Sequence, residues 1–118
     1  MEKTTPNVYS KIDNNLYNAE GDIWWKPDTI LHLLKTSINP WRVGYSAGII
    51  KKLGIVPQGK TALEVGCGGG ILTEEICKMG FTTTGIDPSD NSLQTAQNHA
   101  DASGLDIKYE KGTGEQLP

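Results

Sequence analysis

The glycine-rich stretch "ALEVGCGGGILTEE", residues 62–75, is the part of the sequence best suited to contact a ligand. An apolar run precedes Gly66, Gly68, Gly69 and Gly70, and a helix-like pattern follows them. Glycine leaves its backbone unshielded, and each of these glycines carries an entropic cost on folding. Free amides at the start of a helix also favour a carboxylate or phosphate. We therefore expect a ligand to approach this backbone; the alternative is a tight turn that serves only the fold.

Asp87, in the segment "TGID", is a second residue with an evident chemical use. It ends a β-branched stretch that reads as a strand, where an acid can accept hydrogen bonds from both hydroxyls of a ribose. That role suits an adenine dinucleotide and any other adenosine cofactor equally well. The alternative is that Asp87 only opens the turn "DPSD".

The glycine spacing separates the ligand classes. The dinucleotide fingerprint is G-x-G-x-x-G, but this sequence has G-x-G-x-G and places Ile71 where the third fingerprint glycine should fall. A Walker A loop is excluded because no Gly-Lys-Ser or Gly-Lys-Thr follows the glycines. The motif therefore departs from the known pyrophosphate-binding patterns.

A parallel sheet is needed to bring the glycines and the acid together. From Lys60 onward the sequence predicts strands at "TALEVG", "FTTTGI" and "LDIKYEKG", and helices at "GILTEEICKMG" and "SDNSLQTAQNHADASG". Ser89 is the expected N-cap of the second helix, and Gly80 and Gly104 are the expected helix stops. The order βαβαβ predicts an α/β fold, half of a Rossmann-like doubly wound sheet with strand order 3-2-1.

The N-terminal third reads as helices that precede this sheet. Asp28 is the expected N-cap of a short amphipathic helix. Pro40 is expected to interrupt that helix because it pushes the residue before it out of the α region. A second helix is predicted over residues 41–53, with Gly54 as its stop. Packing in the core or in a lid is the expected role of three residues: Trp24, Trp25 and Trp41.

Composition and charge exclude several classes of function. The chain has 118 residues and a net charge of −3, so it lacks the basic character of a nucleic-acid-binding protein. No apolar run approaches the ~20 residues that cross a membrane, and the N-terminus lacks the apolar stretch of a signal peptide. Cys67 and Cys77 fit neither a disulfide scaffold nor a zinc site. We expect a cytoplasmic protein that binds no metal and no nucleic acid.

The motifs, taken together, carry a resemblance to a known family. "LEVGCGGG" followed by "TGID" resembles motif I and its acidic partner in class I S-adenosylmethionine-dependent methyltransferases. With "WWKPD" and "INPWRVGY" upstream, residues 24–118 resemble the ubiquinone-biosynthesis O-methyltransferase family. The resemblance implies O-methylation of a small molecule, a phenol- or catechol-type quinone precursor, with S-adenosylmethionine as cofactor. The alternatives are a non-catalytic S-adenosylmethionine-binding module and a methyltransferase of another small molecule.

The resemblance also assigns cofactor-binding residues by position: Arg42, Glu64, Gly66, Cys67, Gly68, Asp87, Pro88 and Thr113. It implies that Arg42 binds the cofactor carboxylate by a charge-assisted bond, that Glu64 lies near its amino group and that Pro88 lies against its adenine. Glu64 stands where the family usually has an aspartate, and Thr113 stands where relatives often have an acid.

The same resemblance sets the expected domain organisation. It implies an N-terminal helical cap or lid, residues 1–57, and a cofactor-binding half-domain, residues 58–118, truncated at its C-terminus. The catalytic residues would lie in the absent C-terminal half, so none is named. Strand order 3-2-1 leaves the first strand at an edge, and a bare edge templates pairing. We expect either a homodimer through this strand or completion by the missing half.

Overall fold

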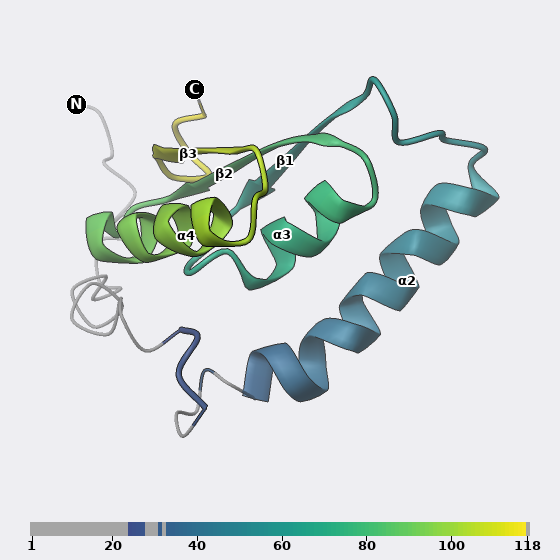
Figure 1. Cartoon of the computed structure of the whole chain (residues 1–118). Helices are drawn as coiled ribbons and strands as arrows, with labels where there is room; N and C mark the ends of the chain where they lie inside the picture. The colour runs from purple at the N-terminus through teal and green to yellow at the C-terminus, as the bar shows by residue number, and fades with distance from the viewer. Residues whose placement is uncertain (1–23, 28–30, 32, 118) are drawn as a thin grey trace, which may run out of the picture.

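A three-stranded parallel sheet is the centre of the fold (Figure 1). The computed structural model describes residues 24–27, 31 and 33–117. The strands are β1 (Thr61–Val65), β2 (Thr82–Asp87) and β3 (Ile107–Lys111), and they lie in the order β1-β2-β3. This is the predicted 3-2-1 order read from the opposite edge. The predicted half of a doubly wound sheet is therefore confirmed.

Two helices connect the strands, and both begin and end where the sequence predicts. They are α3 (Ile71–Lys78) and α4 (Asp90–Ala102). Ser89 caps α4, since its hydroxyl oxygen accepts the backbone N–H of Ser92 at 3.2 Å. Gly80 and Gly104 follow the helix ends with φ of +115° and +70°, which glycine adopts without steric cost.

Both connecting helices lie on one face of the sheet (Figure 1). Right-handed crossovers between strands added in one direction place successive helices on the same side. On the helix-facing side the sheet is well covered, and Ile107 and Thr83 are buried. On β1, at the sheet edge, Leu63 and Val65 keep 45% and 50% of their surface exposed. Among the described residues β1 is an edge strand, as predicted.

The helix before the sheet does not break at Pro40. A π-helical turn, η3 (Leu34–Ile38), continues directly into α2 (Asn39–Lys52). Asn39 has φ −62° and ψ −44°, so the predicted interruption at this residue is wrong. Pro40 lies at the start of α2, where a missing N–H is tolerated, and the N–H of Asn39 reaches back to the Leu34 carbonyl in the wider π pattern. Asp28, the predicted N-cap, lies outside the described residues.

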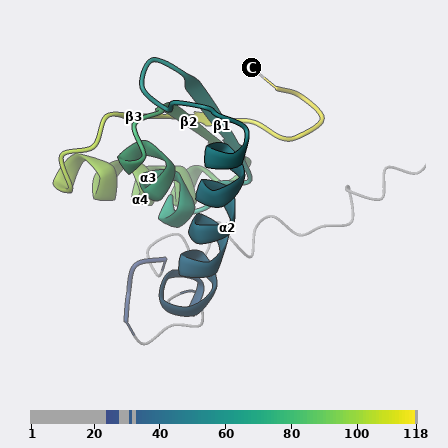
Figure 2. The ribbon, with the colours of Figure 1, turned by 90° about the vertical axis from the view of Figure 1, so that its right-hand side faces the viewer.

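Helix α2 packs beside α3 rather than on the sheet (Figure 2). The side-chain amide of Asn39 donates to the carbonyl of Ile71, the first residue of α3, at 3.2 Å. Trp41 stacks on Tyr45 but is 69% exposed, so of its two predicted roles, packing in the core or in a lid, the first is wrong. Gly54 follows the helix with φ +69°, as predicted. No helix in the described part of the chain is long and apolar enough to cross a membrane.

Candidate functional site

A cavity of about 430 Å³ lies at the carboxyl ends of β1 and β2. The pairing of Val65 with Ile86 brings the loop after β1 next to the end of β2. Ligands of open α/β sheets bind at this edge, and the volume falls within the roughly 300–1,000 Å³ of small-molecule pockets. Four of the predicted cofactor-binding residues line the cavity: Gly66, Gly68, Asp87 and Pro88.

Asp87 is oriented by the backbone around it. The side chain is buried, with only 8% of the residue exposed. One carboxylate oxygen accepts the N–H of Gly68 and the other accepts the N–H of Ser89, both at 2.9 Å. An ionised carboxylate has about four acceptor positions, so each oxygen can accept one more hydrogen bond. Asp87 is therefore fixed at the cavity and can still receive two hydroxyl groups.

Most backbone amides of the glycine loop are already engaged inside the protein. The amides of Gly66 and Cys67 both donate to the carbonyl of Ile86, at 2.8 and 2.9 Å, and the amide of Gly70 donates to the carbonyl of Cys67. With the Gly68 amide, four of the five amides in this loop are engaged. These bonds tie the loop back to β2. They do not involve the amides at the start of α3, so the expectation that those amides favour a carboxylate or phosphate stays a prediction.

The four loop glycines serve two different purposes. A Cβ atom at Gly66 would meet no atom of the described residues within 4 Å, and its φ of +75° favours glycine. A Cβ atom on any of residues 68–70 would instead overlap an aromatic side chain, that of Trp24 or that of Tyr109. Close approach of a ligand can thus explain Gly66. The other three glycines make room for rings of the protein itself, which the sequence analysis did not predict.

Glu64 and Arg42 lie beside the cavity rather than among the residues that line it. The Thr73 hydroxyl donates to the Glu64 carboxylate at 2.7 Å. Burial raises the pKa of Glu64 to about 7, against the opposing effects of that hydrogen bond and of the Arg42 charge. Arg42 donates to the side-chain oxygen of Asn39 at 3.1 Å, and among the described residues its buried Nε has no partner. Both forms of the Glu64 carboxyl are therefore populated near neutral pH.

The two remaining predicted residues also lie outside the cavity lining. Cys67 is 5% exposed, and burial raises the pKa of its thiol far above the ordinary value. Thr113 follows β3 and forms an isolated antiparallel bridge with Gln116. The structure thus brings half of the predicted set together at one cavity.

The cavity wall contains a residue that the sequence analysis did not assign to the site. Trp24 is 9% exposed, clusters with Leu31 and Ile71, and donates from its indole N–H to the Ser92 hydroxyl at 3.0 Å. The adjacent tryptophans signal packing, but nothing in the sequence shows which loop they pack on. In the described ranges, no group of three or more His, Cys, Asp or Glu side chains is placed to hold a metal ion.

Comparison with known proteins finds similarity to methyltransferases. Residues 62–118 match the model of a methyltransferase domain. The ubiquinone biosynthesis O-methyltransferase of Azorhizobium caulinodans is 34% identical over 86% of this chain and 42% of its own length. That of Salmonella newport is 36% identical over 98% of this chain and 47% of its own length. The chain thus spans slightly less than half of the curated relatives that it matches.

Solved structures show the same fold. An S-adenosylmethionine-dependent methyltransferase from Clostridium acetobutylicum superposes with a TM-score of 0.65 at 22% identity, over 74% of this chain and 37% of that protein. The magnesium protoporphyrin IX methyltransferase of Synechocystis, solved with bound SAH, gives a TM-score of 0.65 at 18% identity, over 90% of this chain and 54% of its own. Residues 62–118 thus match a methyltransferase domain model, and the chain is similar to ubiquinone biosynthesis O-methyltransferases.

Proposed function

We propose that this chain is the S-adenosylmethionine-binding part of a methyltransferase that methylates an oxygen of a phenol- or catechol-type quinone precursor. The observation that supports it most is the cavity at the end of β1 and β2, where an open glycine faces a fixed carboxylate. The similarity to ubiquinone biosynthesis O-methyltransferases supports the class of substrate.

The charges and amides around the cavity favour this cofactor over a dinucleotide. A pyrophosphate needs free backbone amides, but four of the five loop amides are engaged. Glu64, when ionised, adds a negative charge beside the cavity, which would repel a phosphate. Asp87 and Glu64 suit a ligand that carries a ribose, an ammonium and a sulfonium.

The residues present fit an S-adenosyl cofactor in the following way. The free acceptor positions of Asp87 receive the two ribose hydroxyls, and Pro88 lies against the adenine. The backbone at Gly66 faces the methionine part. Glu64, with its pKa near 7, is shifted to the ionised form by the cofactor's ammonium. When bound, the cofactor supplies an electrophilic methyl group on sulfur.

Binding preference tests this assignment. We expect S-adenosylhomocysteine and S-adenosylmethionine to bind the chain in calorimetric titrations, and NAD to give no measurable heat at the same concentrations. The physical reason is that the loop offers a ribose acceptor but few amides for a pyrophosphate. Tighter binding of NAD than of S-adenosylhomocysteine would contradict the proposal. Methyl-labelled S-adenosylmethionine with a catechol acceptor then separates turnover from cofactor binding without chemistry.

We also propose that the exposed edge of β1 is covered by further polypeptide, either a second copy of the chain or a C-terminal half that continues the sheet. The position of β1 at the end of the strand order supports this, because an edge strand with unpaired backbone groups rarely stays bare. We expect sedimentation velocity at micromolar concentration to show concentration-dependent association. A cooperatively melting monomer whose sedimentation coefficient does not change with concentration would contradict pairing through β1.

A further inference from the structure

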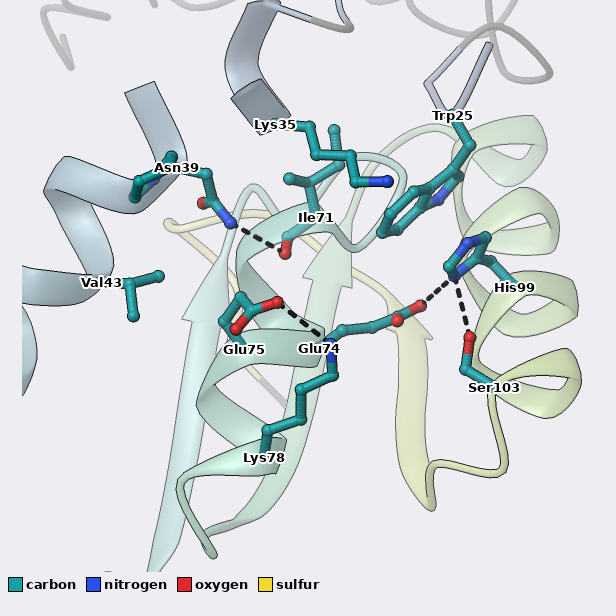
Figure 3. A pocket seen from close by; sticks show the side chains of 11 residues that line it. Trp25, Lys35, Asn39, Val43, Ile71, Glu74, Glu75, Lys78, His99 and Ser103 are labelled. Carbon is teal, nitrogen blue, oxygen red and sulfur yellow. Dashed lines mark hydrogen bonds and ion pairs between the residues drawn. The ribbon is translucent and has the colours of Figure 1, made fainter. Parts of the chain in front are cut away.

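Trp25, the second of the adjacent tryptophans, contacts the glycine loop and α4, and Figure 3 shows it beside His99 of α4. Its indole N–H donates to the carbonyl oxygen of Gly69 at 2.8 Å. Its ring stacks on the imidazole of His99 in α4, with ring centroids 3.4 Å apart and planes within 3°. Trp25 therefore ties residues 24–27 to the glycine loop and to α4 at the same time.

A buried carboxylate holds His99 in turn. The Nδ1–H of His99 donates to the carboxylate of Glu74 in α3 at 2.5 Å, and Glu74 is only 2% exposed. A buried carboxylate needs such a partner, so this bond fixes the plane of the imidazole on which the indole stacks. The ammonium of Lys35 also lies 5.2 Å from the centroid of the Trp25 ring.

We propose that Glu74, His99, Trp25 and the Gly69 carbonyl form a latch that sets how fast the cofactor dissociates. The neighbouring Trp24 forms part of the cavity wall and lies against the glycine loop. Trp24 and Trp25 are adjacent in the chain, so Trp24 can leave the cavity only when the contacts of Trp25 break. The three latch side chains lie outside the cavity lining, so they are positioning residues that act without contacting the ligand. The inference rests on the proposed function.

Dissociation kinetics test the latch directly. We expect His99→Ala to raise the dissociation rate of S-adenosylhomocysteine about tenfold, because it removes both the stacked ring and the bond to Glu74. The association rate should stay within about twofold of the parent, as is usual for changes in contacts that hold a complex closed. Stopped-flow tryptophan fluorescence measures both rates.

The matched control is Gln94→Ala, on the same helix. It removes an exposed hydrogen bond to Asn98 that has no part in the latch, so both rates should match the parent. A second variant, Trp25→Phe, keeps a ring for stacking but loses the indole N–H. We expect its dissociation rate to rise by a smaller factor, about fivefold. Parental dissociation rates in both His99→Ala and Trp25→Phe would overturn the proposal.

Hydrogen exchange of the ligand-free chain gives a second readout. We expect His99→Ala to raise exchange in peptides that contain residues 24–27 and residues 68–70, while peptides from β2 exchange as in the parent. General unfolding would raise exchange in β2 as well. If the parent does not bind S-adenosylhomocysteine, the proposed function is wrong. Hydrogen exchange then tests only whether the latch contacts hold residues 24–27 on the glycine loop. Unchanged exchange in both segments would then overturn it.

Discussion

Replacing Asp87 by alanine is expected to weaken the binding of S-adenosylhomocysteine by about 100-fold or more. The substitution removes the carboxylate and with it two charge-assisted hydrogen bonds to the ribose, each worth roughly 1.5–3 kcal/mol. The variant also removes the acceptor of the Gly68 and Ser89 amides, so the loop would lose its fixed position at the cavity. Calorimetric titration measures the affinity.

Asp90→Ala is the matched control for this prediction. Asp90 lies in the first turn of α4, its side chain is 70% exposed and it pairs with Lys111 at 3.0 Å. It therefore carries the same charge near the site without contacting the cavity, and its loss should change the affinity by less than about twofold. An Asp87→Ala variant that melts cooperatively and binds within twofold of the parent would show that the ribose assignment is wrong.

Replacing Gly66 by valine is expected to abolish cofactor binding. At φ +75° a β-branched residue is strained by roughly 1–2 kcal/mol. The new side chain meets no protein atom within 4 Å of its Cβ, so it would project into the open space where we place the methionine part of the cofactor. The expected result is a folded protein with no measurable heat of binding.

Gly54→Val separates backbone strain from occupation of the cavity. Gly54 has φ +69°, a Cβ there also meets no atom within 4 Å, and it follows α2 away from the site. Both variants should therefore lose similar stability in thermal melts, whereas only the change at Gly66 should lose binding. Equal binding by the two valine variants would refute close approach of the ligand to Gly66.

The sheet and the acid at its edge were predictable because their signals are local. Each strand and helix of the βαβαβ unit has its own periodicity, and Ser89, Gly80 and Gly104 mark boundaries by their backbone chemistry. Asp87 followed from its place at a strand end. These inferences needed no knowledge of contacts between distant segments.

The errors concern contacts between segments far apart in the chain. The packing at three loop glycines was not predicted: a Cβ atom on any of residues 68–70 would overlap Trp24 or Tyr109. No local pattern shows that a tryptophan upstream of α2 packs on a loop after β1. The continuous helix through Pro40 had a different cause, because the π turn before it supplied a backbone geometry that the rule for residues before proline does not consider.

The adjacency of successive strands has a consequence for how the chain folds during synthesis. β1 pairs with β2 and β2 with β3, so the sheet can grow outward one strand at a time as the chain leaves the ribosome, with one helical crossover closed at each step. The tryptophan contacts are different: Trp25 bonds a residue 44 positions later, and Trp24 one 68 positions later. The wall of the cavity can therefore close only after Ser92 in α4 has been made, so the site is completed after β1 and β2 have been synthesised.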